Sequence, residues 1–147
     1  MNLSDAQREQ GFTHALLPQR LTAGIVASRL FLEEGALVAS NVPPLRHHSE
    51  TGFDFGSDGA GASDLALACI QAMLEGLDYV GPTQKLNDGS RVYRLSHTLH
   101  APFRQQFIEP AVGDELRIPW NKALAWMRQT LLMHIRAEKL SLEGVFD

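Results

Sequence analysis

The sequence contains a single cysteine, and this scarcity removes two classes of structure. One thiol cannot form a disulfide within the chain, and it cannot build the thiolate clusters that hold structural zinc. Cys69 lies inside the apolar stretch 65–74, where a small thiol usually packs in the core and does not act as a nucleophile. We therefore predict a reducing environment and a buried, unreactive Cys69.

Long apolar runs and an excess of positive charge are also missing. No stretch approaches the roughly 18 apolar residues that a membrane span needs, and the start MNLSDAQREQGF lacks the basic and apolar regions of a signal peptide. The net charge is -4, which disfavours the broad phosphate-backbone binding that requires clustered lysine and arginine. These absences predict a cytoplasmic protein without a membrane partner, for which nucleic acid is the less favoured partner.

The composition that remains is that of a globular domain, with 44% apolar and 20% charged residues. A chain of 147 residues forms one domain that buries about two-thirds of its unfolded surface. We expect a single domain over 21–140 and a C-terminal tail in 141–147. Residues 1–20 are expected to form either an arm or a short helix that Pro18 would end.

Two segments carry the patterns of main helices. The segment at about 64–75 is apolar on all sides, which is typical of a central buried helix, with Ser63 at the N-cap and Asp64 in the first turn. The segment at about 120–139 follows a proline and has an amphipathic stripe at three- and four-residue spacing. The stripe consists of Trp120, Leu124, Met127, Leu131 and Ile135.

Shorter segments predict a small sheet. Residues 24–40 favour a hairpin with its turn at Glu34–Gly35, and 112–118 favour a turn followed by a strand. Residues 103–110 are expected to form a strand, and 92–101 either a strand or a short helix that ends before Pro102. Residues 79–91 are expected to be a surface loop. The sum is an α+β domain, with a small antiparallel sheet packed against two main helices.

A glycine-rich stretch, HHSETGFDFGSDGAGASD, precedes the central helix. Backbone N–H groups at a helix start can hold an anion, but no lysine or arginine follows in this loop, and Asp58 and Asp64 would repel a phosphate. We favour a structural role, in which the glycines supply positive φ angles and allow a close approach to the helix. The alternative is a small-ligand or metal-binding loop over 52–64. Its candidate ligand or interaction residues are His48, Ser49, Asp54, Asp58 and Ser63.

The histidines form two pairs far apart in the sequence. His47 and His48 are adjacent, so in an extended chain their side chains would point in opposite directions. His97 and His100 have the i, i+3 spacing that places two imidazoles on one face of a helix. No signature spacing joins the pairs to Asp54 or Asp58 in a four-ligand site, so we expect no metal and no cofactor. His48 is expected to bond back to its own loop, together with Ser49.

No complete catalytic signature is present. The candidate nucleophiles Ser49, Ser57, Ser63 and Cys69 do not lie in a G-x-S-x-G elbow, so we predict no catalytic residue. Paired carboxylates such as Asp54 and Asp58 are more often solvated than catalytic. A local basic strip could serve nucleic-acid binding. It would consist of Arg91, Arg94, His97, His100 and Arg104.

The stretch 47–70, followed by FRQQFIEP and PWNKALAWM, resembles a family of small domains of unknown function that bacteria, phages and plasmids carry. The family run reads H-S-P-T-G-F-E-W-G-Y-G-G-S-G-P-A-x-L-A, and the resemblance covers roughly residues 28–127. The matching residues are His48–Ser49, Thr51–Gly52–Phe53, Gly56, Gly59, Gly61 and Leu65–Ala66. The departures are Glu50 and Ala62 in place of prolines, Phe55 in place of tryptophan, and Ser57–Asp58 in place of Tyr-Gly.

The resemblance implies a mobile-element or accessory setting, in which small acidic proteins often act by binding another protein. The function predicted from the sequence is therefore a non-catalytic protein-interaction module, a phage- or plasmid-type accessory factor that binds a host protein. The apolar C-terminal helix is compatible with a homodimer. The alternatives are a nucleic-acid-associated protein and a small-ligand or metal-binding domain.

Overall fold

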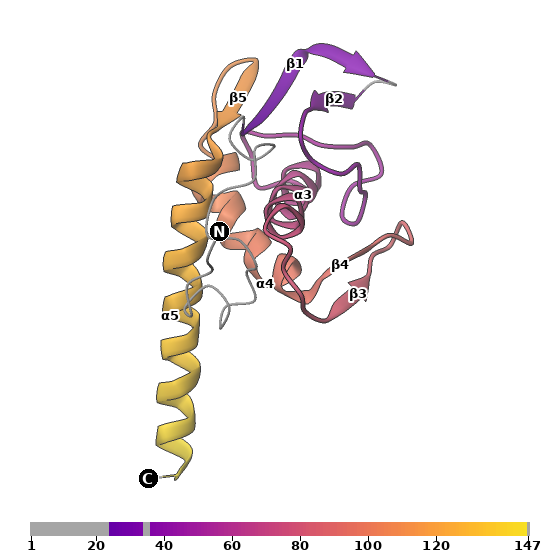
Figure 1. Ribbon diagram of the computed structural model, residues 1–147. Coiled ribbons are helices and arrows are strands. Elements are labelled where there is room, and N and C mark those ends of the chain that lie inside the picture. Colours follow the sequence, from indigo (N-terminus) through magenta and orange to yellow (C-terminus); the bar gives the residue numbers. More distant parts are fainter. Residues whose placement is uncertain (1–23, 34–35, 147) are drawn as a thin grey trace.

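The computed structural model describes residues 24–33 and 36–146, and Figure 1 shows their arrangement. A three-stranded antiparallel sheet lies at one end of the domain, and a separate two-stranded hairpin lies beside the central helix. This is a mixed α+β architecture, so the predicted fold class is confirmed. The expected arm or helix in 1–20 and the hairpin turn at 34–35 lie outside the described residues.

The three-stranded sheet has the order β2-β1-β5, and both pairs of strands are antiparallel. Strand β1 (Ile25–Glu33) pairs with β2 (Ala36–Ala39), as the hairpin prediction requires. Strand β5 (Glu115–Ile118) pairs along the other edge of β1, which confirms the strand predicted in 112–118. In β5, Leu116 and Ile118 are buried and alternate with exposed residues, so one face of the strand packs on the core.

The central helix α3 (Ala60–Gly76) is buried along almost its whole length. It begins earlier than the sequence indicated, with Gly59 as its N-cap and no side-chain capping bond. The N-cap prediction for Ser63 and the start near residue 64 were therefore wrong. Ser63 instead lies within the helix, and its hydroxyl accepts a hydrogen bond from Arg104, 2.8 Å away. That interaction depends on a distant segment and leaves no local signal.

A second hairpin, β3 (Thr83–Lys85) with β4 (Arg91–Tyr93), replaces part of the predicted surface loop. Few apolar residues mark these strands, which explains why the pattern was missed. A small second core holds the hairpin against α3 and the segment before residue 47. Its buried members are Leu45, Leu67, Ala68, Leu86 and Val92.

Helix α4 (Arg94–Phe103) continues through Pro102 into a π-helical turn, η1 (Arg104–Ile108). The expected helix end before Pro102 and the strand in 103–110 were therefore wrong. Proline removes one helical N–H donor, and wide π-type turns accommodate such local irregularities. Burial of Phe103 and Ile108 in the main core stabilises the segment as a helix despite its strand-like composition.

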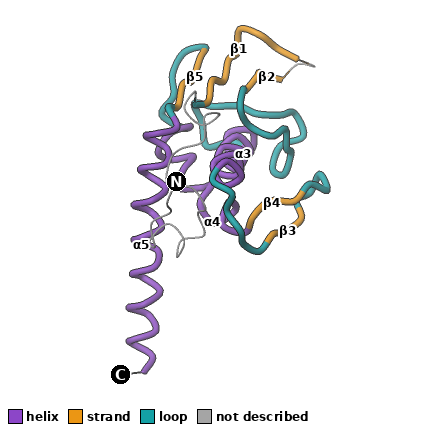
Figure 2. The backbone as a smooth tube through the Cα atoms, viewed as in Figure 1, coloured by secondary structure: helices purple, strands orange, loops and turns teal. Residues whose placement is uncertain are grey.

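Helix α5 (Trp120–Phe146) runs beside the rest of the domain, and its C-terminal part extends past it (Figures 1 and 2). It is longer than the predicted 120–139 and includes residues 141–146 of the stretch expected as a tail. Trp120, Met127 and Leu131 of the predicted stripe are buried and Leu124 is half-buried, while the side chain of Ile135 lies outside the described residues. Ala123, outside the predicted stripe, is buried as well. The ring of Trp126 meets that of Phe103 at 5.3 Å between centroids, so α5 packs on the end of α4. No helix in the described part of the chain has the length and apolarity of a membrane span.

Candidate functional site

Four histidine rings from two distant segments form one cluster in the structure. The ring centroids of His47 and His48 are 4.6 Å apart, and those of His97 and His100 are 4.8 Å apart. The two pairs meet, because His47 lies 5.7 Å from His97 and His48 lies 5.2 Å from His100. The expectation that His47 and His48 point in opposite directions was therefore wrong. We call these four residues the histidine cluster.

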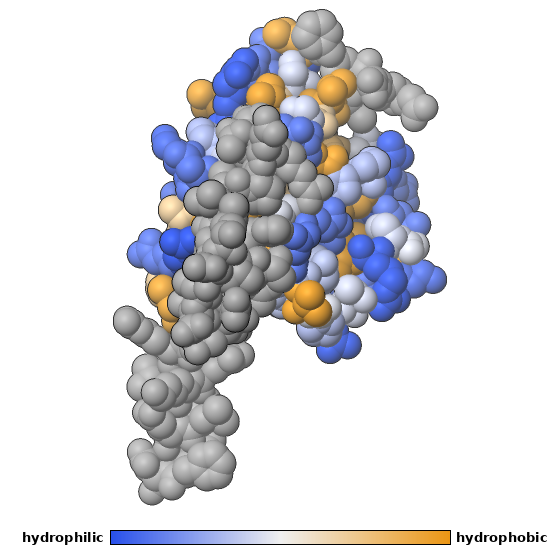
Figure 3. Space-filling view, viewed as in Figure 1, coloured by the Kyte–Doolittle hydropathy of each residue, from blue (hydrophilic) through white to orange (hydrophobic). Residues whose placement is uncertain are grey.

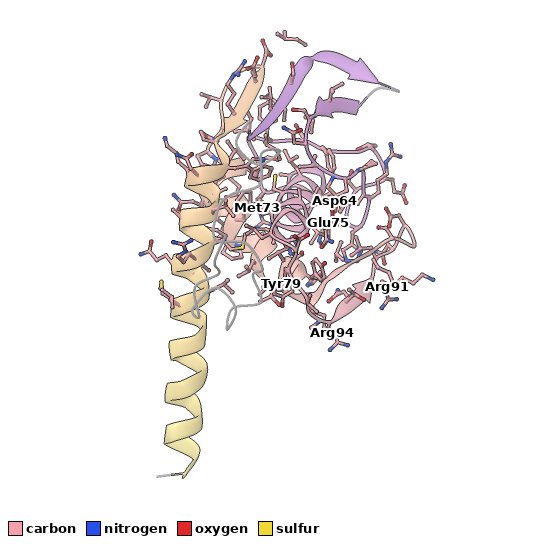
Figure 4. The ribbon with its side chains drawn as sticks, in the orientation of Figure 1. Asp64, Met73, Glu75, Tyr79, Arg91 and Arg94 are labelled. Carbon is pink, nitrogen blue, oxygen red and sulfur yellow. The ribbon has the colours of Figure 1, made fainter. Side chains whose placement is uncertain are left out.

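The carboxylate of Asp64 explains why the two adjacent histidines lie together. Asp64 is fully buried on α3, on the side that faces the preceding loop (Figure 4), and it accepts three consecutive backbone N–H groups. The donors are His47 at 3.0 Å, His48 at 2.8 Å and Ser49 at 2.9 Å. Three successive amides converge on one side chain only if the backbone curves. The segment is therefore bent and not extended.

The small second core fixes the other side of this segment. Leu45 and Leu86 are both buried in it, which brings residues 46–49 beside the turn after β3. Two hydrogen bonds then join the segments. The backbone N–H of Asn87 donates to Nδ1 of His47 at 3.0 Å, and the Asn87 side-chain amide donates to the His47 carbonyl at 2.8 Å.

Helix α4 is positioned by a buried glutamine on α3. The side-chain oxygen of Gln71 accepts the backbone N–H of Tyr93 at 3.0 Å and the hydroxyl of Ser96 at 2.8 Å. These bonds fix the start of α4 against α3. His97 and His100 follow Ser96 on this helix, and their rings contact those of His47 and His48 at the bend held by Asp64.

The ring nitrogens of His100 and His48 have assignable roles. Nδ1 of His100 meets the backbone carbonyl of His97, which can only accept, so Nδ1 carries the proton. Nε2 of neutral His100 is then an acceptor, and Nε2 of His48, 3.1 Å away, is the donor. Neutral His48 therefore has its lone pair on Nδ1. The two rings are nearly parallel, with an interplanar angle of 20°.

The surroundings of these two imidazoles favour the neutral form, because they lower the pKa of both. Desolvation by burial lowers the pKa of His100, and neighbouring His97, His48 and Arg104 lower it further, against the hydrogen bond to His97. Desolvation also lowers the pKa of His48, although the Asp64 carboxylate acts in the opposite direction. A neutral imidazole is the form that binds a metal ion.

Three members of the cluster have the geometry of a ligand set. One ring nitrogen from each of His47, His48 and His97 lies within 4.8 Å of the other two. His48 is exposed, and His47 and His97 are partly buried. His100 is 7% exposed and lies behind His48. Asp54 and Asp58, the carboxylates considered from the sequence, do not belong to this group.

The other predicted ligand residues have separate positions. The hydroxyl of Ser49 accepts the N–H of Thr51 at 3.1 Å, which confirms its predicted role in bonding the loop to itself. His48 bonds instead to the distant His100, so that part of the prediction was wrong. Asp54 forms an ion pair with Arg29 at 3.0 Å, and Asp58 is exposed.

The glycine-rich loop has mainly the predicted structural role. Gly56 has a positive φ of 81°, and a Cβ at Gly61 would lie 2.7 Å from the carbonyl oxygen of Gly52. Gly59 differs, because its φ is -71° and an added Cβ would meet only the Ser57 hydroxyl, at 3.3 Å. The close approach to the helix therefore depends on Gly61, while Gly56 supplies a positive φ.

The residues of the predicted basic strip have different environments. Arg91 and Arg94 are exposed and point away from the body of the domain (Figure 4). His97 and His100 belong to the histidine cluster. Arg104 forms an ion pair with Glu109 at 2.9 Å, and its side chain is 19% exposed. The i, i+5 spacing of this pair matches the π-helical turn that also joins their backbones.

Cys69 has the position that the sequence predicted. It is fully buried on α3, and burial raises the pKa of its thiol well above the ordinary value. The thiol therefore remains protonated at neutral pH and packs as a small core residue.

Comparison with known proteins gave no match to a family model, to a curated protein or to a solved structure. The resemblance to small phage and plasmid domains therefore remains a prediction from the residues, and function has to be argued from the site.

Proposed function

We propose that this protein binds one divalent transition-metal ion through His47, His48 and His97. The observation that carries the proposal is the convergence of three ring nitrogens within 4.8 Å at a partly exposed surface. Zinc–nitrogen bonds of 2.0–2.1 Å place neighbouring ligand atoms of a tetrahedron about 3.3 Å apart. Side-chain rotations that move the rings by about 1 Å would close the site. This proposal replaces the expectation of no metal.

The ligand chemistry favours one class of ion. Imidazole nitrogen suits zinc, copper, nickel and cobalt, whereas magnesium and calcium prefer oxygen ligands. With three protein ligands, a fourth position would be open to water or to an exogenous group.

The tautomers support ligation by His48 in particular. Metal-bound histidines usually donate their second ring N–H to a fixed acceptor, which orients the ring. His48 donates Nε2–H to His100, whose own orientation is set by the carbonyl of His97. The lone pair on Nδ1 of His48 is then directed by two successive hydrogen bonds. His100 would act as a positioning residue behind the ligand.

Protein interaction, the function predicted first, has less geometric support. The exposed large apolar residues come from several separate segments of the described chain, and Figure 3 shows isolated apolar residues among hydrophilic ones on one face. These residues are Leu30, Val80, Val112, Leu132 and Met133. Such scattered exposure is normal for a protein surface. Binding to a host protein, phage or plasmid origin and a homodimer remain proposals that no observation among the described residues favours.

The test is a titration of the full, tag-free chain with Co²⁺ and Zn²⁺. Co²⁺ bound by three imidazoles and water in a tetrahedral arrangement has strong visible absorption, and Zn²⁺ should displace it at one ion per chain. Mg²⁺ and Ca²⁺ should not compete. Absence of a saturable visible signal, together with no heat of Zn²⁺ binding by calorimetry, would refute the proposal.

Matched variants separate the histidine cluster from the other histidines. His97→Ala removes one ligand but keeps the carbonyl that holds His100, so we expect metal affinity to fall more than about 100-fold. The double variant His14→Ala and His134→Ala removes the histidines outside the cluster and should leave the affinity unchanged. The reverse pattern would assign the ion to other ligands.

A further inference from the structure

We infer that a metal ion and the backbone N–H of Asn87 compete for the imidazole of His47. A bound ion therefore breaks the hydrogen bond from Asn87, which lies in the turn between β3 and β4. This inference rests on the proposed metal site and concerns its regulation. It starts from one bond, the 3.0 Å hydrogen bond from the backbone N–H of Asn87 to Nδ1 of His47.

The chemistry of a neutral imidazole makes the competition unavoidable. The ring has one N–H and one lone pair, and in His47 the lone pair is on Nδ1, where it accepts the Asn87 N–H. An ion bound at Nδ1 takes this lone pair directly. An ion bound at Nε2 requires the proton to move to Nδ1, where it faces the amide proton of Asn87. In both arrangements the bond from Asn87 is lost.

The released amide belongs to a tight turn. The N–H of Gly89 donates to the carbonyl of Leu86 at 3.0 Å, so Leu86–Gly89 is a β-turn with Asn87 at its second position. Asp88 in the same turn accepts the backbone N–H of Arg46 at 2.8 Å. The turn is thus joined to this segment at Arg46 as well as at His47.

The change is expected to remain local. Leu86 is 3% exposed in the second core, and the side-chain amide of Asn87 still has the His47 carbonyl as its acceptor. Loss of one backbone hydrogen bond therefore alters the turn without detaching the hairpin. A single such bond corresponds to a weakening of metal binding by about 3- to 10-fold relative to a chain without it.

The second position of a β-turn allows a direct test. Proline is favoured there, and Asn87→Pro removes the N–H donor. Its Cδ takes the place of the amide hydrogen that points at Nδ1 of His47, so the His47 ring must also turn away from this position. Asn87→Ala is the matched control, because both variants lose the side-chain amide and only the proline variant loses the backbone donor. We expect Asn87→Pro to bind Zn²⁺ about 3- to 10-fold more tightly than Asn87→Ala.

Amide NMR of the wild-type chain gives the second readout. On saturation with Zn²⁺, the Asn87 amide proton should shift upfield and exchange faster with solvent, while the amides bound to Asp64 keep their protection. Equal Zn²⁺ affinities of the two folded variants, or an unchanged Asn87 amide in the saturated protein, would overturn this inference alone. Should the proline variant not fold, as judged by circular dichroism, the NMR result decides. Absence of Zn²⁺ binding by wild type overturns the metal site itself.

Discussion

The Nε2 atoms of His48 and His100, 52 positions apart in the sequence, lie 3.1 Å from each other and share one proton. His48 contributes that proton, and His100 can accept it because its own Nδ1 proton is directed at the carbonyl of His97. A protonated His48 can still donate this hydrogen bond, but if both rings were protonated neither Nε2 could accept it. The protonation state of the buried His100 is therefore linked to the orientation of the exposed His48.

Substitution of His48 can test the roles of its two ring nitrogens separately. The amide nitrogen of glutamine substitutes for Nε2–H, and the oxygen of asparagine substitutes for Nδ1. If Nδ1 is the ligand atom, His48→Gln should keep the fold and the bond to His100 but lose more than about 100-fold in Zn²⁺ affinity. Calorimetry with Zn²⁺ and urea unfolding measure the two effects. Unchanged affinity in His48→Gln would assign the ligand role to another atom.

His100 is expected to affect metal binding without touching the ion. His100→Gln retains an acceptor near the Nε2 position, so metal affinity should remain within a few-fold of wild type. His100→Leu leaves Nε2–H of His48 without its acceptor, and affinity should fall about 10- to 100-fold, the usual effect of losing a residue that orients a ligand. The Co²⁺ spectrum separates this role from ligation, because its tetrahedral bands should persist in both variants. A loss of those bands in His100→Gln would make His100 a ligand.

The sequence predicted the elements whose signals are local. The apolar stretch around α3, the stripe of α5 and the hairpin of β1 and β2 each carry their pattern within a few residues, and packing followed those patterns. The segment 103–110 was misassigned because Phe103, Phe107 and Ile108 suit a strand, while tertiary burial selects a helix.

The histidine cluster had no such local signal. Its members come from a bend and from α4, and only packing against α3 brings them together. One clue was present in the sequence, since Asp64 lies on a helix that is apolar on all sides. A carboxylate buried there must be hydrogen-bonded. That reasoning would have predicted a neighbouring loop with several backbone donors, although not which loop.

Stability should fall as the pH falls through the titration of the histidine pair. In the unfolded chain both residues titrate near pH 6.5, and in the folded protein desolvation lowers the pKa of each. The unfolded state then binds more protons in this window, so stability is complete above about pH 6.5 and decreases below it. Urea unfolding from about pH 8 to about pH 5 measures the slope.

His100, the buried histidine of the pair, should contribute the larger part of the dependence of stability on pH. His100→Gln removes this contribution, so its stability should depend less steeply on pH than that of wild type. A slope that is identical in the variant would show that other groups cause the loss at acid pH. Stability that rises on acidification would contradict the lowered pKa values themselves.

Replacing Asp64 by a neutral residue should disturb the bend at residues 47–49, because this carboxylate holds all three of its backbone N–H groups. In Asp64→Asn the carboxylate that accepts three backbone N–H groups becomes an amide with one acceptor oxygen, and at least one of these N–H groups loses its acceptor and faces the amide NH₂ instead. We expect a loss of about 2–3 kcal/mol in the free energy of unfolding and faster amide exchange at residues 47–49. The exposed Asp58→Asn is the control, with an expected change within about 0.5 kcal/mol. Similar losses in both variants would indicate a general charge effect.

Gly59 and Gly61 in the glycine-rich loop form a matched pair of substitution sites. They separate the effect of the close contact between α3 and residue 52 from the general effect of replacing a glycine. An added methyl at Gly61 would lie 2.7 Å from the Gly52 oxygen and 3.0 Å from Cβ of Asp54, both close to the backbone, so the loop must shift. Gly61→Ala should therefore cost about 1–3 kcal/mol in the free energy of unfolding. Gly59→Ala has an ordinary φ and only the movable Ser57 hydroxyl nearby, so it should cost less than about 1 kcal/mol. Urea unfolding of the two variants measures the difference. Equal costs would mean that the chain does not depend on the contact between α3 and residue 52, and that the glycines serve flexibility instead.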